Sequence, residues 1–278
     1  MDLTLLKAAL PSIPVVSQLP GVRKTGADPS GLHFERIATV DADHVRAYAE
    51  VCGFPVKDTA PLTYPHLLAF PLHMAVMTSP DFPYPAIGTV HLANSITSHR
   101  PVSVAETLHV AVSATTPRPH PKGHVVDLKA AATAGGEVVW ESTSTYLRRG
   151  RGDEAAVDGT GPVEIPDAGA EWRLPGDLGR RYAAVSGDHN PIHLYPLTAK
   201  ALGFPRQIAH GMWSLARCVA AVENRLPGAV TVEVAFKKPI FLPGTVGFGL
   251  AVRDDGLAFA MTSPKDGAPH VVGRTHPA

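Results

Sequence analysis

The sequence predicts an α+β fold made of two similar units in tandem, each with a long apolar helix followed by an antiparallel sheet. The chain of 278 residues has the length of two ordinary domains. Short segments recur in the same order in its two halves. Several strand-like segments, separated by turn residues, follow the helical part of each half. Together these observations favour a duplicated α+β unit.

The internal repeat consists of three pairs of segments. They are Tyr48–Phe54 with Tyr182–Asp188, Pro61–Leu67 with Pro205–Gly211, and Arg100–Thr107 with Lys238–Thr245. Chance matches rarely stay in order along a chain, so we expect an N-terminal unit at 1–148 and a C-terminal unit at 173–278. Residues 149–172 between them are rich in Gly, Pro and acidic residues, which is typical of a linker.

The elements of each unit follow from the spacing of apolar residues. In the second half, a helix-periodic run opens at Gly211 and stops at Pro227-Gly228. The predicted strands are 91–99, 107–115, 125–134 and 137–147 in the first half and 230–236, 245–253, 257–262 and 270–275 in the second. Asp255-Gly256 is the expected hairpin turn between the second and third strands of the later group.

Residues 59–80 contain no Asp, Glu, Lys or Arg, which raises the question of a membrane span. The stretch is interrupted by Pro61, Pro65, Pro71, His66 and His73, and these residues disfavour a membrane helix. We therefore expect a helix buried within the protein, or the wall of an apolar tunnel.

Composition limits the class of partner. The net charge is zero and only 18% of residues are charged, which disfavours a broad surface for nucleic acid or anionic membranes. The partner is expected to be a small molecule. Cys52 and Cys218 lie in apolar helical contexts and form no disulfide framework, which fits a reducing compartment. Asp2, Pro11 and Pro14 disfavour a signal peptide, so we expect a cytoplasmic protein.

The segments Tyr182–His193 and Ile208–Met212 carry the clearest chemical signal. Asn190-Pro191 predicts a turn that lets Asp188 and His193 converge. A carboxylate and an imidazole sharing a water form a general acid/base pair near neutral pH. Gly211, at the start of a helix, offers an unpaired N–H to a developing oxyanion. Taken alone, the pattern also fits a capped turn or part of a metal site.

The motif Tyr-Ala-x-x-Ser-Gly-Asp-x-Asn-Pro-Ile-His, followed by His-Gly-Met, resembles the hydratase-2 motif of MaoC-like (R)-specific enoyl-thioester hydratases. The whole pattern resembles (3R)-hydroxyacyl-thioester dehydratases with two hot-dog units. The resemblance implies a double hot-dog fold and a hydro-lyase that reversibly hydrates trans-2-enoyl thioesters to (3R)-hydroxyacyl thioesters in fatty-acid metabolism. It also implies site roles: Asp188 and His193 hold the water, the Gly211 N–H binds the thioester carbonyl, and Asn190, Ser186 and His210 support them.

The first unit lacks the chemical groups of the second. Phe54 stands at the position of Asp188, Leu67 at that of Gly211, and no Asn-Pro-x-His follows. We expect the first unit to bind the acyl chain and act as a scaffold, with a preference for medium to long chains. Pairing of the units is expected to bring their long helices side by side and the motif to the junction.

The expected partner is an acyl-CoA or acyl-carrier-protein thioester. Arg206, Lys237 and Lys238 are candidates for contacting its phosphates. We expect no metal or redox cofactor, because the chain has no Cys/His cluster with ligand spacing and no glycine-rich phosphate loop. The protein is expected to be a monomeric pseudo-dimer or a homodimer. The sequence leaves acyl-chain length, the choice of CoA or carrier protein, the direction of reaction and the assignment of acid and base open.

Three alternatives stay open at this point. The first is an acyl-thioester hydrolase on the same fold, which would also use an acid near a helix N-terminus. The second is a non-catalytic acyl-thioester binding protein. The third is a metal-dependent hydrolase that uses His189, His193 and His210.

Overall fold

The structure is a computed structural model that describes residue 24 and residues 28–86, 88–157 and 164–278. The residues used to argue against a signal peptide, Asp2, Pro11 and Pro14, lie outside the described residues, as do residues 158–163 of the predicted linker. Within the described part, no helix is long and apolar enough to cross a membrane.

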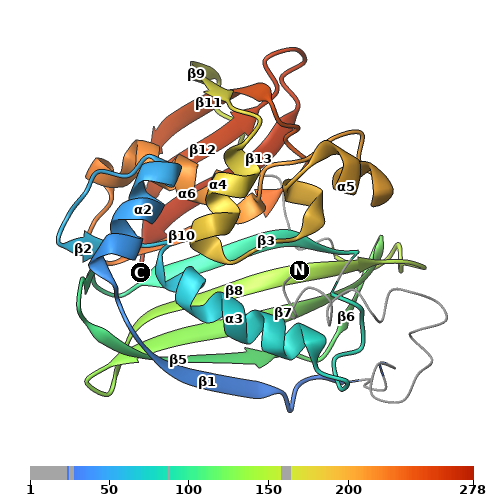
Figure 1. Cartoon of the computed structure of the whole chain (residues 1–278). Coiled ribbons are helices and arrows are strands. Elements are labelled where there is room, and N and C mark those ends of the chain that lie inside the picture. Colours follow the sequence, from blue (N-terminus) through green and yellow to red (C-terminus); the bar gives the residue numbers. More distant parts are fainter. Residues whose placement is uncertain (1–23, 25–27, 87, 158–163) are drawn as a thin grey trace.

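Eleven of the described strands form one continuous antiparallel sheet (Figure 1). Its order is β1-β5-β7-β8-β3-β10-β13-β12-β11-β9, with β6 paired to β7. The first half contributes β1 (His33–Thr39), β3 (Thr89–Ser98), β5 (Thr107–Ala114), β6 (Arg118–His120), β7 (Gly123–Ala134) and β8 (Glu137–Arg149). The second half contributes β9 (Ala168–Leu174), β10 (Val230–Phe236), β11 (Gly244–Arg253), β12 (Gly256–Thr262) and β13 (Pro269–Pro277). A separate short pair joins β2 (Thr59–Ala60) to β4 (Val102–Ser103).

The two halves join through β3 and β10, which are equivalent strands in the repeat. They pair antiparallel over six residue pairs, with Ile96 opposite Val232. The hydroxyls of Thr97 and Thr231 lie 2.9 Å apart across this junction. Antiparallel pairing of equivalent strands is what an approximate two-fold relation between duplicated units produces.

The helices lie on one side of this sheet. The first half contains α2 (Ala42–Cys52) and α3 (Pro65–Thr78). The second contains α4 (Leu178–Ser186), η3 (Pro191–His193), α5 (Pro196–Ala201), α6 (Gly211–Val222) and η4 (Glu223–Arg225). The repeated glycines Gly53 and Gly187 end α2 and α4 with φ of 80° and 73°. Glycine adopts this left-handed conformation without a steric penalty, which explains its recurrence in both halves.

The charge-free stretch forms α3, whose side chains are largely buried, so the prediction of a buried helix is confirmed. Helix α3 packs against β1, β5 and β7, and α6 packs against β12. The prediction that the long helices of the two halves lie side by side is wrong, because α3 and α6 do not form the main helix contact between the halves. Helix α2 makes the extensive helix contacts between the halves, against α4 and α6. The rings of Tyr48 and Tyr182, equivalent in the repeat, are 6.3 Å apart in this contact.

The α+β double hot-dog fold and the eight predicted strands are confirmed, with shifts at their ends. The hairpin turn lies at residues 254 and 255, because Arg253 pairs with Gly256. Helix α6 ends at Val222 and is followed by η4, short of the predicted stop. The sequence missed β1 and β9, which are the two edge strands and are mostly exposed. Strand β9 begins at Ala168, within the range predicted as linker.

Both cysteines are free and buried. Burial raises the pKa of both thiols. A buried thiol with a raised pKa is unreactive at neutral pH, so Cys52 and Cys218 contribute packing.

Candidate active site

Asp188 lies just beyond the end of α4, in a loop held by local hydrogen bonds. Gly187 turns the chain out of the helix. The backbone N–H of Asp188 donates to Ser186 Oγ over 3.2 Å, and the N–H of Asn190 donates to Asp188 Oδ1 over 3.1 Å. The side-chain oxygen of Asn190 in turn accepts from the Ile192 N–H at 3.4 Å. Ser186 and Asn190 therefore shape the loop that carries the carboxylate.

His193 closes the short helix η3, which Asn190 caps and Pro191 opens. Its Nδ1–H donates to the carbonyl of Ile208 over 2.8 Å, since a carbonyl can only accept. This bond fixes the tautomer and leaves Nε2 as a hydrogen-bond acceptor. The residue is buried. The imidazole is therefore a neutral base with one nitrogen anchored and the other available.

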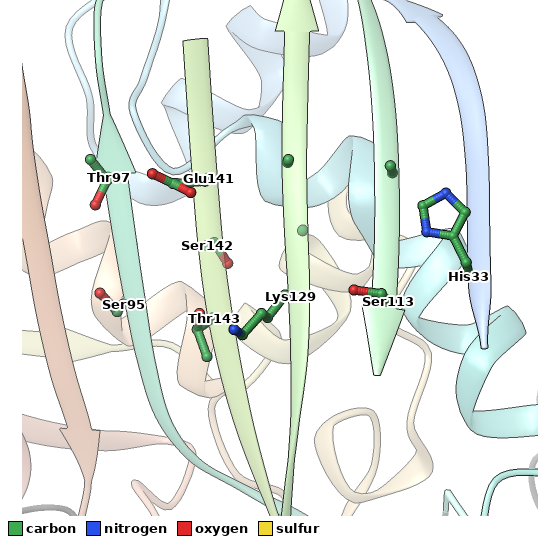
Figure 2. A pocket seen from close by; sticks show the side chains of 11 residues that line it. His33, Ser95, Thr97, Ser113, Lys129, Glu141, Ser142 and Thr143 are labelled. Atoms are coloured by element: carbon green, nitrogen blue, oxygen red, sulfur yellow. The ribbon is translucent and has the colours of Figure 1, made fainter. Parts of the chain in front are cut away.

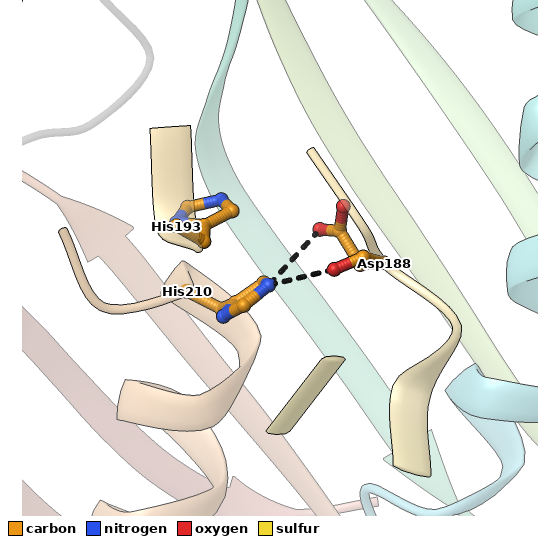
Figure 3. A group of neighbouring side chains, drawn as sticks. All are labelled: Asp188, His193 and His210. Carbon is orange, nitrogen blue, oxygen red and sulfur yellow. Dashed lines mark hydrogen bonds and ion pairs between the residues drawn. The ribbon is translucent and has the colours of Figure 1, made fainter. Parts of the chain in front are cut away.

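His210 precedes α6 and connects it to the Asp188 loop. Its Nε2–H donates to the backbone carbonyl of Asp188 over 2.9 Å and lies 3.9 Å from Asp188 Oδ2 (Figure 3). Its ring stacks on that of His193 with centroids 3.7 Å apart. His210 is thus placed to position both members of the predicted pair.

The structure brings Asp188, His193 and His210 together: one ligand atom from each lies within 4.8 Å of the others. This is the convergence that the Asn-Pro turn predicts for Asp188 and His193. Among the described residues this is also the one group of three spaced to hold a metal ion. The metal-hydrolase alternative named His189, His193 and His210 as ligands, but the group in the structure contains Asp188 and not His189.

Burial and neighbouring charges have opposite effects on the pKa values of Asp188 and His193. Burial alone would raise the pKa of Asp188, but His210, His193 and the Asn190 N–H more than compensate and lower it. Burial lowers the pKa of His193, although Asp188 and the Ile208 carbonyl oppose the shift. Burial also lowers the pKa of His210 to about 3. At neutral pH the site therefore holds an ionised carboxylate and neutral imidazoles.

Gly211 is the first residue of α6, as predicted, so its N–H lacks an intrahelical acceptor. A Cβ at this position would lie 3.2 Å from the ring of Phe236, the last residue of β10. The absence of a side chain lets this ring and the helix N-terminus approach each other closely. The amide lies at the boundary between the helix layer and the strand that joins the two halves.

Two further residues position the site, and the sequence reasoning missed them. A Cβ on Gly179, in α4, would come within 1.9 Å of the carbonyl oxygen of His193, so only glycine admits the η3 loop here. His44 of α2 donates from Nε2 to the carbonyl of Val185 over 2.7 Å and ties the first unit to the end of α4. A glycine inside a helical segment can mark a close approach of another segment, and this was the available signal for Gly179. Nothing local marked His44.

The candidate phosphate-binding cations Arg206, Lys237 and Lys238 are all exposed. The guanidinium of Arg206 lies over the ring of Phe241, 5.9 Å from its centroid. Lys237 and Lys238 directly follow Phe236 in the chain. Lys237 and Lys238 are therefore exposed directly after the end of β10, whose last residue, Phe236, lies against Gly211.

A groove of about 410 Å³ lies elsewhere, across the strands of the first half (Figure 2). Residues such as Ser95, Thr97 and Lys129 line it. These alternate along β3 and β7 with Ile96 and Leu128, which are buried in the core. Because alternate side chains of a strand point to opposite faces, the groove lies on the face away from the core. It is separate from the Asp188 site.

Known proteins and a solved structure are similar to this chain over most of its length. A model of the MaoC like domain matches residues 162–267. The chain is 38% identical to 3-hydroxyacyl-thioester dehydratase X of Mycobacterium tuberculosis, over 95% of this chain and 92% of the relative. It is 35% identical to the (R)-specific enoyl-CoA hydratase of Aeromonas caviae over 30% of this chain and 66% of that protein. The crystal structure of HtdX of M. tuberculosis superposes with a TM-score of 0.79, at 37% identity, covering 89% of this chain and 100% of the other.

The fold and the site define a double hot-dog protein with a carboxylate–imidazole pair at the junction of its halves. The chain belongs to the MaoC-like dehydratase family. The family predicted from the Tyr182–Met212 motif is therefore confirmed, as is the class of enzyme, a hydro-lyase.

Proposed function

We propose that the protein catalyses the reversible hydration of trans-2-enoyl thioesters to (3R)-hydroxyacyl thioesters in fatty-acid metabolism. One observation carries this proposal: the Asp188 carboxylate and the His193 imidazole converge beside the first amide of α6. The names of the dehydratase and (R)-specific hydratase relatives support the same reaction. The substrate is an acyl-CoA or acyl-carrier-protein thioester.

The proposed mechanism uses the protonation states of the pair. Ionised Asp188 and the free Nε2 of His193 both accept hydrogen bonds, so one water donates to both. As the water oxygen adds to C3, one member of the pair takes a proton from the water and that proton is delivered to C2 on the same face, so the water supplies both the hydroxyl and the hydrogen. Charge that develops on the thioester oxygen is stabilised by the Gly211 N–H at the helix N-terminus.

The remaining groups have supporting roles in this proposal. Ser186, Asn190 and His210 hold the loop and the rings in place. Arg206, Lys237 and Lys238 attract the phosphates of the CoA or carrier arm. The first unit binds the acyl chain. We further propose a cytoplasmic enzyme that acts as a monomeric pseudo-dimer or a homodimer.

We propose that the reaction needs no metal or redox cofactor. His193 Nδ1 and His210 Nε2 each donate a proton to a backbone carbonyl. A metal ligated by His210 Nε2 would have to replace the proton that bonds Asp188 O. We expect full hydration activity after exhaustive chelation. Activity lost on chelation and restored by a divalent ion would instead favour the metal-dependent hydrolase.

The test is a hydration assay over trans-2-enoyl-CoA chain lengths with chiral analysis of the product. We expect loss of the enoyl absorbance and exclusively 3R product. Release of free thiol without hydroxyacyl product would favour a thioesterase. Tight binding with no change in absorbance would favour a non-catalytic binding protein.

A further inference from the structure

Two buried histidines and one half-buried histidine of the first half form a row with Tyr146, which we call the histidine seam. It comprises His66 and His73 of α3, His91 of β3 and Tyr146 of β8. The ring centroids of His66 and His73 are 5.2 Å apart, those of His73 and Tyr146 are 6.4 Å apart, and His91 stacks on Tyr146 at 4.6 Å. The sequence had predicted apolar surroundings for an acyl chain in this half.

The seam contains hydrogen-bonding atoms that other described residues do not satisfy. They are His66 Nδ1, both ring nitrogens of His73, and His91 Nε2. Asn94 Oδ1 and Ser142 Oγ, on the buried side of β3 and β8, also lack a partner within the described part of the chain. A buried polar group without a hydrogen-bond partner destabilises the folded protein. Leucine would fill such a position without that cost, so packing alone gives no reason for histidine.

The seam is continuous with the proposed reaction centre. The Phe236 ring, which lies against Gly211, is 5.0 Å from His91 between ring centroids. A thioester whose carbonyl meets the Gly211 N–H therefore has the seam just beyond Phe236. The candidate phosphate-binding cations are exposed, whereas the seam is mostly buried, so the CoA arm would lie at the surface and the acyl tail would extend toward the interior.

The chemistry of the seam selects a neutral polar group. Burial lowers the pKa of His66 to about 4 and of His91 to about 3, and it holds His73 well below its ordinary value. The three imidazoles are thus uncharged at neutral pH and offer both donors and acceptors. An anionic group would find no cation among these four side chains, and Asp188 is near enough to influence His66 and His91 electrostatically.

We propose that the histidine seam is a subsite for a hydroxyl or carbonyl group on the acyl chain of the substrate. This inference rests on the proposed hydratase function. A substrate with an oxygen at the right carbon satisfies the imidazole nitrogens, whereas a plain alkyl chain leaves them unpaired. Sites built to bond a polar substrate group discriminate strongly against analogues that lack it.

The test uses trans-2-enoyl-CoA thioesters of one chain length, each with a single hydroxyl or ketone at successive carbons beyond the double bond. At one position, we expect kcat/KM to exceed that of the plain chain by about tenfold or more. In His73→Leu and His91→Leu this ratio should fall to about one. The exposed His124→Leu, on β7, is the matched control and should keep the wild-type ratio.

Each outcome has a distinct meaning. If the wild type prefers the plain chain at every position, or if both folded variants keep the wild-type ratio, the seam proposal is wrong. A higher melting temperature in His73→Leu with an unchanged ratio would assign the histidine to packing. If the wild type hydrates neither kind of chain, the proposed function itself fails. The wild-type series alone decides the question if the variants do not fold.

Discussion

At the residue scale, the site depends on which nitrogen of each histidine is already engaged. His193 is anchored through Nδ1 and keeps Nε2 free, whereas His210 uses Nε2 to hold the Asp188 carbonyl. His193 and His210, whose rings are stacked, therefore have different roles. The sequence already separated them, because His66 occupies the position of His210 in a half without Asp188. His210 is therefore a positioning residue in our account.

Replacing His210 tests this positioning role. His210→Leu removes the donor to the Asp188 carbonyl and should lower kcat about tenfold, the value of one hydrogen bond of about 1.4 kcal/mol. His210→Gln retains a donor and should recover most of the rate. Steady-state kinetics on one enoyl-CoA measures both. Equal losses in the two variants, as large as for His193→Ala, would give His210 a direct chemical role.

The pH dependence of kcat/KM follows from the two lowered pKa values. In the proposed mechanism the active form has ionised Asp188 and neutral His193, and the pKa of His193 lies below its ordinary value of 6.5. The acidic limb of the profile should therefore have its midpoint below pH 6.5. An acidic limb with its midpoint at or above pH 6.5 would contradict this state of the pair.

At the element scale, the junction of α4, η3 and α6 positions the pair. The sequence predicted the turn at Asn190-Pro191 and the start of α6 at Gly211, because these residues are strong local signals. It could not predict β1 or β9, whose exposed edge positions carry no alternating pattern. Nor could it find the contact between α4 and the His193 carbonyl, because that contact depends on how two segments pack.

Gly179→Ala tests the packing of α4 against η3. The added methyl would overlap the His193 carbonyl oxygen, so the loop must shift and carry the imidazole with it. Misplacement of about 1 Å can cost about a hundredfold, and we expect a loss of that order in kcat/KM. Gly169→Ala in β9, with open space around the new methyl, should match the wild type. Wild-type activity in Gly179→Ala would show that the close approach is dispensable.

At the scale of the whole molecule, duplication produces one sheet with one reaction centre. The order of the repeated segments predicted the two units, and β3 pairs with β10 as a two-fold relation requires. The sequence also predicted which half had lost Asp188 and Gly211. It did not predict the histidine seam, because His66, His73, His91 and Tyr146 come together only after α3 packs onto the sheet.

Stability should depend on pH through the buried histidines. His66, His91 and His210 have folded-state pKa values of about 4, 3 and 3, against an ordinary value of 6.5. The unfolded chain binds more protons below pH 6.5, so stability is fully present above that value and is lost as the pH falls towards 4. Each histidine contributes a slope of about 1.4 kcal/mol per pH unit within this window.

Denaturant unfolding between pH 7 and 5 measures this slope. His66→Leu should reduce it by about 1.4 kcal/mol per pH unit, whereas the exposed His124→Leu should leave it unchanged. A wild-type stability that is constant from pH 7 to 5 would contradict the burial of neutral imidazoles.

The most direct test of the central claim is the rate of enoyl-CoA hydration by Asp188→Asn and His193→Ala. Each variant removes a group that, in the proposed mechanism, holds the attacking water, but the hydrogen bond from the Asp188 backbone N–H to Ser186 stays in place. We expect each to lower kcat/KM by about a hundred- to ten-thousandfold, with the same fold by circular dichroism. The wild type should give only 3R product. Unimpaired hydration by either variant, or 3S product from the wild type, would contradict the account.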